Sequence, residues 1–485
     1  MARFAEAIAA HATARPTHPA IRFENEVIDY AGLESRISAE AGRLRAEGVE
    51  VGDRVVVLAG NDPSFIVVLL ACVRIGAIFV PLNTRLTAAE IAFQVGHCSP
   101  VRAIAADDLL DELAMAAPQL AVDPLTMVGT VDDVAVSTTG FAADAPAMIV
   151  YTSGTTGRPK GATHTHGSVD ATVDNGVVAH DLGPDDVGLE FLPLFHVGGL
   201  NIQTLPLLTV GGTVVLHRGF DADAVFDALE ADELTISIIV PTPMQVMIDH
   251  PRWAHVEPGR LRGFMTGSSI VPAPLLQAFN DAGLRAGQVY GATETGPTSV
   301  VLRFEDAARV GSCGRASGTA EVRLVGSAGR EASHGEVQIR GPHVFCGYWN
   351  DPEATARAFD GDWYRTGDVA EIDADGWVTI RDRLGDMIIS GGENVYPAEI
   401  EPVLADAPGV AELTVIGLAD ERWGQTPVAV VVAEPGCEPT LEQLREHGGR
   451  ALARYKLPTR LELVDELPRT ALGKVRKNEL AARFP

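Results

Sequence analysis

YTSGTTGRPKG, residues 151–161, is the stretch that decides the fold prediction, and it follows an apolar run over residues 147–151 that predicts a buried strand. Glycine lets a backbone approach a ligand closely and adopt positive φ, so consecutive N–H groups can converge on anionic oxygens. The serine and threonine hydroxyls add donors, and Lys160 adds a full positive charge. A Gly/Ser/Thr-rich hairpin without a ligand is the alternative. Lys160 favours a phosphate-binding loop.

The spacing is not that of a Walker P-loop, which places Lys-Ser/Thr directly after a glycine five residues beyond the first. Counting from Gly154, the corresponding residues are Pro159, Lys160 and Gly161. The stretch instead resembles the phosphate loop of the adenylate-forming superfamily, which includes acyl-CoA synthetases, aryl-CoA ligases, nonribosomal adenylation domains and luciferases.

Further strings occur in the order that this superfamily uses. They are YGATETG at residues 290–296, YRTGD at 364–368 followed by RDRLGDMIISGGENVYPAEIE at 381–401, and PRTALGK at 468–474. Such an order is far harder to obtain by chance than any one match. The resemblance covers essentially the whole chain and is strongest to bacterial acyl- and aryl-CoA ligases.

Composition agrees with a cytoplasmic enzyme. The chain has 485 residues, 38 Lys and Arg against 65 Asp and Glu, and a formal net charge of −27. That acidity argues against nucleic acid or an anionic membrane as a partner, because both would repel it.

The five cysteines show no CxxC spacing, so free thiols are expected. The apolar stretch 64–82 is broken by Arg74, Gly76 and Pro81, which predicts a buried helix and strand and no transmembrane segment.

The pattern along the chain predicts an α/β fold with largely parallel sheets. Strand-like runs at residues 54–58, 213–216 and 237–240 alternate with helical patterns such as residues 222–231. A strand-like run over residues 377–380 ends before a fresh α/β pattern begins. The resemblance places a domain boundary at the same point. It implies a large multi-layer N-terminal domain over residues 1–384 that binds ATP and the acyl group, and a small mobile C-terminal lid domain over residues 385–485.

The resemblance also implies a hinge at this boundary. Relatives usually carry Asp or Lys where this chain has Gly385. Glycine can absorb a large φ/ψ change, so the departure puts a hinge salt bridge in doubt and leaves the motion expected.

The implied function is ligation of a carboxylic acid to CoA through acyl-AMP, with ATP, Mg²⁺ and CoA as cofactors. The expected partners are a small-molecule acid, ATP and CoA, and a homodimer is compatible with the sequence. One alternative is an acyl-AMP ligase that loads a carrier protein, although the insertion typical of long-chain members is not found. Another is a luciferase-like monooxygenase or a non-catalytic relative. The charged residues of the motifs are all present, which argues against loss of activity; they are Lys160, Glu294, Asp368, Arg383 and Lys474.

An ionised carboxylate is already a nucleophile, so its attack on ATP needs positioning and charge neutralisation more than a general base. By resemblance, Glu294 is the Mg²⁺ ligand, with Thr155 or Thr156 nearby; a solvated helix-end acid is the alternative. Lys474 would bridge the substrate carboxylate and the phosphates, whereas a solvated tail lysine is the default. The residues expected to act in catalysis are Lys474, Glu294, Thr155, Lys160 and His196.

In the nucleotide site the resemblance places adenine on Tyr290 and the ribose hydroxyls on Asp368, with Arg383 beside the sugar. The residues expected to bind ATP and AMP are Thr152, Ser153, Gly154, Thr155, Thr156, Gly157, Lys160, Gly267, Ser268, Ser269, Tyr290, Gly291, Ala292, Thr293, Asp368, Arg383 and Lys474. The residues expected to contact CoA are Gly391, Gly392, Glu393, Trp423, Arg454 and Lys456. For Trp423, Arg454 and Lys456, a core or solvated role is an equal alternative.

The residues expected to line the acyl pocket are small or apolar, which suits the uncharged tail of a medium- or long-chain aliphatic acid or of an aryl acid. The pocket residues are His196, Val197, Gly198, Gly199, Met244, Gly267, Gly296, Pro297 and Thr298. Amino-acid-activating relatives place an acidic residue near the segment PLFHVGG to bind the ammonium, and we expect none there in this chain. Malonate-activating relatives carry Arg where this chain has Val289. Both substrate classes are therefore disfavoured. His164 and His166 alternate on a predicted strand, but a metal site would need a third ligand that the spacing does not supply.

Overall fold

The computed structural model describes residues 3–125, 141–152, 159–231, 233–267, 271–326, 328–390, 393–420, 424–452, 454–470 and 473–484. The chain divides into two compact units. The first comprises Met1–Val322 and Ile339–Arg365, and the second comprises Arg323–Gln338 and Thr366–Pro485.

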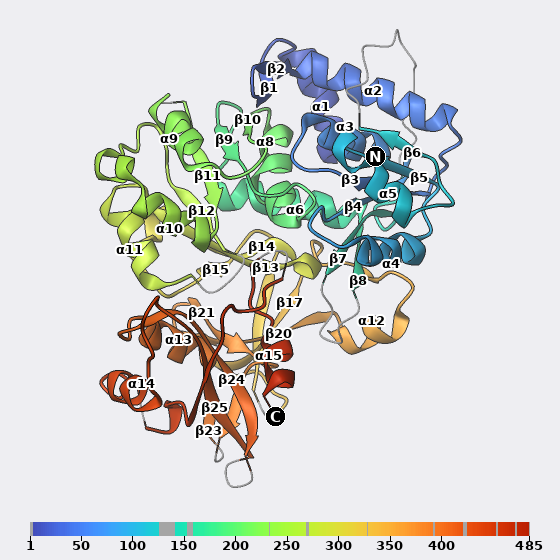
Figure 1. The fold of residues 1–485 in the computed structure, drawn as a ribbon. Helices are drawn as coiled ribbons and strands as arrows, with labels where there is room; N and C mark the ends of the chain where they lie inside the picture. Colours follow the sequence, from blue (N-terminus) through green and yellow to red (C-terminus); the bar gives the residue numbers. More distant parts are fainter. Residues whose placement is uncertain are drawn as a thin grey trace. The chain divides into compact units, whose positions relative to one another are not determined.

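Two largely parallel sheets build the first unit (Figure 1). One has the order β15 (Arg315–Ala316), β14 (Gly296–Leu302), β13 (Ala286–Ala292), β12 (Phe264–Thr266), β11 (Ile236–Ile239), β9 (Val187–Glu190), β10 (Thr213–Leu216), β1 (Pro19–Phe23) and β2 (Glu26–Asp29). The other has the order β18 (Gly347–Tyr348), β8 (Lys160–Thr165), β7 (Pro146–Thr152), β4 (Ile78–Leu82), β3 (Arg54–Leu58), β5 (Arg102–Ala105) and β6 (Val122–Pro124). Antiparallel pairs occur at the ends of both sheets.

Helices cover these sheets. They are α1 (Arg3–Ala14), α2 (Tyr30–Ala46), α3 (Pro63–Ile75), α4 (Ala88–Cys98), α5 (Leu110–Ala116), α6 (His166–His180), α7 (Val197–Gly199), α8 (Leu205–Val210), α9 (Ala222–Glu230), α10 (Pro241–Asp249), α11 (Ala273–Asp281) and α12 (Pro352–Ala358). The sequence sets both ends of helix α3. Asp62 caps its first turn, Pro63 is its first residue, and Gly76 ends it in the left-handed conformation. Helix α6 contacts β8 of one sheet and β14 of the other, so it lies in the layer between them.

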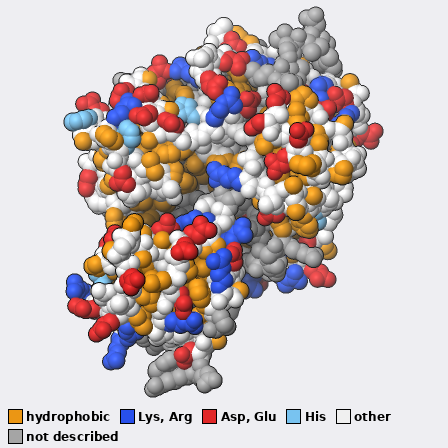
Figure 2. Space-filling model, in the orientation of Figure 1, with side chains coloured by type: hydrophobic (Ala, Val, Ile, Leu, Met, Phe, Trp, Pro, Cys, Tyr) orange, Lys and Arg blue, Asp and Glu red, His pale blue; other side chains and the backbone are white. Residues whose placement is uncertain are grey.

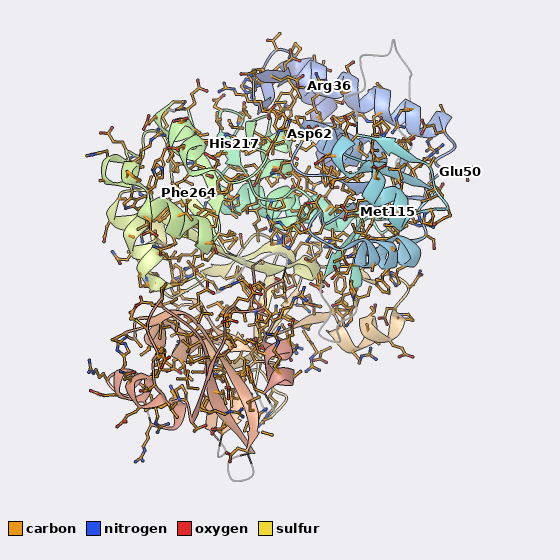
Figure 3. All side chains as sticks on the ribbon, in the orientation of Figure 1. Arg36, Glu50, Asp62, Met115, His217 and Phe264 are labelled. Atoms are coloured by element: carbon orange, nitrogen blue, oxygen red, sulfur yellow. The ribbon has the colours of Figure 1, made fainter. Side chains whose placement is uncertain are left out.

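A buried amide ties the two sheets together. Asn61, which follows β3, donates from its side chain to the carbonyls of Leu192 and His217, each at 3.0 Å, and accepts from Leu194 N–H at 2.9 Å. Figure 3 shows Asp62 and His217 beside this junction, and Phe264 at the start of β12. Phe264 is fully buried and packs edge-on against Phe279. The first unit is thus fixed by large apolar clusters and a few fully bonded polar groups.

A third sheet has the order β16 (Glu321–Val325), β17 (His334–Arg340), β20 (Trp363–Ile372) and β19 (Phe359–Asp360), with β21 (Val378–Arg383) paired to β20. The division between the units falls inside β16, β17 and β20. The second unit adds a sheet of β23 (Glu393–Val395), β22 (Ile388–Ser390), β25 (Gly424–Ala433) and β24 (Val410–Asp420), with β26 (Arg460–Leu463) parallel to β25. Its helices are α13 (Pro397–Ala405), α14 (Leu441–Gly448) and α15 (Lys477–Arg483).

Much of the predicted fold is confirmed. The expected strands at 54–58 and 213–216 are β3 and β10, and the apolar stretch 64–82 is α3 followed by β4. None of the helices in the described ranges is long and apolar enough to cross a membrane. Acidic, basic and apolar side chains are interspersed over the face in Figure 2. One expectation is wrong. His164 lies in β8, whereas His166 is the first residue of α6, so the two histidines do not alternate on a strand.

Candidate active site

The predicted phosphate loop joins two paired strands. Thr152 at the end of β7 lies opposite Lys160 at the start of β8. Tyr151 anchors β7 to α4, because its hydroxyl donates to the Gln94 carbonyl at 3.1 Å and lies 2.9 Å from Nδ1 of His97. The predicted loop residues between these strands, Ser153, Gly154, Thr155, Thr156 and Gly157, lie outside the described residues.

Glu294 lies on a 3₁₀ turn, η4 (Thr293–Thr295), which follows β13. Its backbone carbonyl accepts from Phe345 N–H at 2.8 Å, and the preceding carbonyl, of Thr293, accepts from His164 Nε2–H at 2.8 Å. Burial lowers the pKa of His164 to about 4, so this imidazole is a neutral donor at pH 7. The backbone around Glu294 is therefore held from both sides.

Glycines make this tight geometry possible. A Cβ on Gly291 would lie 2.2 Å from the Gly296 carbonyl oxygen, and Gly296 itself has φ of 62°. No other residue fits either requirement without strain. The glycines of YGATETG thus shape the turn that presents Glu294.

The carboxylate of Glu294 is surrounded by hydroxyl donors. It accepts from the Tyr348 hydroxyl at 2.9 Å and from the Thr152 hydroxyl at 3.5 Å. The residue is 8% exposed, so the solvated helix-end alternative is wrong. The Lys160 ammonium lies 5.0 Å from the centre of the Tyr348 ring. Burial, and then the nearby Glu294 charge, raise the pKa of Tyr348, which keeps its phenol a donor.

These donors fit a hard cation. A buried carboxylate whose described partners are neutral hydroxyls keeps a negative charge that a cation would compensate, and Mg²⁺ prefers oxygen ligands. In the described part of the chain, no group of three or more His, Cys, Asp or Glu is placed to hold a metal. Most ligands of such a cation would therefore have to come from phosphate and water oxygens.

The predicted adenine side of the site lies where β12 and β13 end. A Cβ on Gly267 would lie 2.5 Å from the Val289 carbonyl oxygen, so glycine allows the two strands to approach. Tyr290 is half-buried on β13, opposite Val300. Ala292 and Thr293 follow it, and Ala292 N–H is bonded to the Thr295 hydroxyl at 2.8 Å. Ser268 and Ser269 lie outside the described residues.

His196 caps the N-terminus of the short helix α7. Its Nδ1 accepts from Gly198 N–H at 3.1 Å, and the ring is half-buried. A Cβ on Gly199 would lie 2.6 Å from the carbonyl oxygens of Leu192 and Pro193, so this segment turns back tightly on itself.

The other predicted acyl-pocket residues are uncharged and mostly buried. Met244 on α10 is fully buried in an apolar cluster, and Thr298 on β14 is almost fully buried. Val197, Gly296 and Pro297 are buried as well.

One acidic residue near this segment was missed. Glu190 ends β9, three residues before the PLFHVGG segment, and is fully buried. Its carboxyl group accepts from Leu192 N–H at 2.7 Å and from the Thr204 hydroxyl at 3.4 Å. Burial holds the pKa of Glu190 well above its usual range. This fully buried carboxyl group is engaged by backbone and hydroxyl donors of the chain itself, although its position close to PLFHVGG was a visible signal.

In the second unit, Asp368 and Arg383 are brought together as register partners on β20 and β21. Arg383 Nε lies 2.9 Å from Asp368 Oδ1, and the Asp368 side chain is far less exposed than that of Arg383. Asp368 N–H donates to the Thr366 hydroxyl at 3.0 Å. The carboxylate is thus oriented, with one oxygen engaged by the guanidinium.

Lys474 lies in a hairpin turn of the same unit. Thr470 N–H donates to the Lys474 carbonyl at 2.7 Å, and Gly473 has φ of 82°. Desolvation of the ammonium and repulsion by Arg383 lower the pKa of Lys474, and attraction to Asp368 opposes them. The residue nevertheless keeps an exposed surface.

The predicted CoA contacts are only partly described. Arg454 is exposed on a 3₁₀ turn, η6 (Arg454–Lys456), and Lys456 forms an ion pair with Glu399. Gly385 lies in the turn after β21, has no positive φ, and would leave open space around an added Cβ. Gly391, Gly392, Trp423 and the side chain of Glu393 lie outside the described residues.

Tyr348 is a site residue that the motifs did not indicate. It lies in GYWN, and β18 brings it beside Lys160 because Tyr348 pairs with Ala162 of β8. Its sequence signal is weak, since the pairing joins segments far apart in the chain.

Comparison with known proteins finds two family matches in the chain. Residues 8–349 match the AMP-binding enzyme family, and residues 399–474 match the AMP-binding enzyme C-terminal domain. The chain is 41% identical to the indoleacetate–CoA ligase of Aromatoleum aromaticum, covering 97% of this chain and 96% of the relative. It is 40% identical to the feruloyl-CoA synthase of an Amycolatopsis species, over the same shares. The crystal structure of ATP-bound MatB from Rhodopseudomonas palustris superposes with a TM-score of 0.90 at 31% identity, covering 99% of both chains.

Proposed function

Because this chain belongs to the AMP-binding enzyme family and is an acid–thiol ligase of the acyl-CoA synthetase type, we propose that it works through two half-reactions. In the first, a carboxylate oxygen attacks the α-phosphorus of ATP, forming acyl-AMP and releasing pyrophosphate. In the second, the CoA sulfur attacks the acyl carbon, the bond from that carbon to the phosphate oxygen breaks, and AMP leaves. The thiol proton passes to solvent.

The observation that carries the proposal is the buried Glu294 carboxylate beside Thr152, with Lys160 on the paired strand. Preorganised charges of this kind stabilise the charge that accumulates when a carboxylate meets a triphosphate. Glu294, with the Thr155 or Thr156 hydroxyl, would hold Mg²⁺. When bound, Mg²⁺ would neutralise phosphate charge. Lys160 would contact the phosphates directly.

The second unit would serve both half-reactions. Asp368 has a carboxylate oxygen that can accept from ribose hydroxyls, and Arg383 already orients it. Lys474 would neutralise the carboxylate and the phosphates during adenylation. We place the boundary of the mobile domain between residues 384 and 385, with Gly385 as the hinge. Gly392 would take part when the thiol attacks.

We propose that the acid carries an uncharged tail, with aryl acids ahead of aliphatic ones. The predicted pocket residues that are described, including Val197, Met244 and Thr298, bring no charge to bind a second carboxylate or an ammonium. The names of the two relatives, an indoleacetate–CoA ligase and a feruloyl-CoA synthase, both denote aryl acids.

The test is a panel of aryl and aliphatic acids assayed for AMP and pyrophosphate release with and without CoA. We expect CoA-dependent AMP release and acyl-CoA formation, fastest with an aryl acid. Acyl-AMP that accumulates and is not consumed by CoA would instead indicate a carrier-loading ligase. Oxygen consumption coupled to light would indicate a luciferase-like enzyme.

A further inference from the structure

Tyr348 contacts both charged side chains at the base of the predicted phosphate loop. Its hydroxyl donates to Glu294 Oε1 at 2.9 Å, while the Lys160 ammonium lies 5.0 Å from the centre of its ring. The face of a phenol ring attracts a cation, and its O–H is a strong donor to a carboxylate. One side chain therefore serves an anion and a cation at once.

The backbone fixes Tyr348 in this place. Strand β18 is antiparallel to β8, Trp349 N–H donates to the Gly161 carbonyl at 2.8 Å, and Tyr348 N–H donates to the Thr355 hydroxyl at 2.9 Å. Gly347 has φ of 141°, and a Cβ on it would lie 2.7 Å from the Thr355 methyl. Tyr348 and Lys160 are thus delivered by neighbouring strands of one sheet.

The hydroxyl of Tyr348 is itself supported. The Tyr364 side chain forms a hydrogen bond to Tyr348, and both residues pack against the ring of Phe345. Phe345 in turn donates its N–H to the Glu294 carbonyl. The rings of Phe345, Tyr348 and Tyr364 therefore pack together, and a backbone hydrogen bond joins them to the turn that bears Glu294.

Lys160 and Glu294 carry opposite charges and would neutralise each other if they met. In the described residues no ion pair joins them, and Tyr348 contacts both. We propose that Tyr348 is a positioning residue for ATP, which keeps Lys160 and Glu294 apart and oriented so that both charges stay available to the triphosphate and its cation. This inference rests on the proposed function, because it assumes that the site binds ATP.

The test measures ATP binding by titration calorimetry, first in EDTA and then at increasing Mg²⁺. Tyr348→Phe keeps the ring over Lys160, so the metal-free Kd should stay within about twofold of wild type. It removes the donor to Glu294, so the Mg²⁺ concentration for half-maximal ATP binding should rise about tenfold, as expected for a residue that orients a metal ligand.

Tyr348→Leu removes the ring as well. Lys160 can then pair with Glu294, and the metal-free Kd should rise about fivefold or more. Adding Glu294→Gln to this variant removes the competing anion, and metal-free binding should recover toward wild type. A structural defect would not be rescued in this way. If Tyr348→Leu fails to fold, the Mg²⁺ dependence of ATP binding in Tyr348→Phe still tests the role of Tyr348.

The control is Tyr30→Phe, which removes another buried tyrosine hydroxyl of the same unit, one that donates to the Leu208 and Gly212 carbonyls. It should leave both binding parameters at wild-type values. Tyr348 variants that behave like wild type, or a Tyr30→Phe variant that shifts the same parameters equally, would overturn the role of Tyr348. A wild-type chain that binds no ATP would overturn the proposed function itself.

Discussion

The two units hold their predicted site residues in different ways. In the first unit, Glu294 is buried, its turn is bonded on both sides, and three neighbouring strands of one sheet bring Thr152, Lys160 and Tyr348 to it. In the second unit, Lys474 is exposed in a hairpin turn. Burial and bonding suit charges that must be preorganised before ATP arrives. If Lys474 serves only adenylation, as proposed, a position in a short exposed turn would let it leave the site after that step.

The largest expected effect tests the second unit. Lys474→Ala should slow acyl-AMP synthesis from ATP by about 10²-fold or more, because a charge aimed at the reacting groups is lost. Supplied with synthetic acyl-AMP and CoA, the variant should form thioester at close to the wild-type rate. A pair of single-turnover assays measures both steps.

Lys477→Ala is the matched control for Lys474→Ala. Lys477 begins α15 and lies 2.9 Å from Glu401, so its loss should lower stability without changing the ratio of the two half-reactions. If Lys474→Ala slows both halves alike, Lys474 has a structural role and the contrast between the units fails.

The first unit is tested by Glu294→Gln. The amide keeps the shape and removes the charge, so the variant should fold normally and adenylate about 10²-fold more slowly, which corresponds to about 3 kcal/mol. The rate should be measured as a function of Mg²⁺ concentration, with thermal unfolding as the folding control. An unchanged rate and Mg²⁺ dependence would remove Glu294 from the site.

The two half-reactions should also differ in their dependence on pH. If Lys474 acts in adenylation as proposed, that step should need its charged form, and the pKa of Lys474 lies below its ordinary value of 10.5. Activity is therefore present below that pKa and falls, about tenfold per pH unit, once the pH rises above it. Thioester formation from acyl-AMP should instead rise with pH as the CoA thiol ionises.

Lys474→Arg sharpens this pH prediction. A guanidinium stays protonated over the whole range, so the alkaline decline of adenylation should disappear in the variant even if its rate is lower. Stopped-time measurements of pyrophosphate release between pH 7 and the limit of stability would show it. A decline that persists unchanged in Lys474→Arg would assign the titration to another group.

The predictions that the structure confirms are those that depend on local sequence. The parallel α/β fold and the buried strand before the loop follow from apolar runs and glycines, which act locally: β3 and β10 match their predicted residues. Tyr348 could not be found in this way, because its partner Lys160 is brought to it by strand pairing across a long stretch of chain. His166 was misplaced because the strand ends at Thr165, whose side chain caps α6. Glu190 was overlooked because it lies outside the PLFHVGG segment, and its burial and hydrogen bonds are visible only in the structure.

The smallest expected effect concerns Gly385. An added Cβ there meets open space and the residue needs no positive φ, so Gly385→Ala should leave both half-reactions within about twofold of wild type.

Gly385→Pro differs, because the proline ring fixes φ near about −65° and restricts the preceding residue. If the hinge must turn between two orientations, this variant should slow the half-reactions unequally, by about fivefold relative to one another. The ratio of single-turnover rates for adenylation and thioester formation is the measurement, with Gly385→Ala as the matched control. If Gly385→Pro slows both half-reactions equally and unfolds at the wild-type temperature, the turn after β21 is a fixed connection. The contrast between a preorganised unit and a moving one would then have to rest on Lys474 alone.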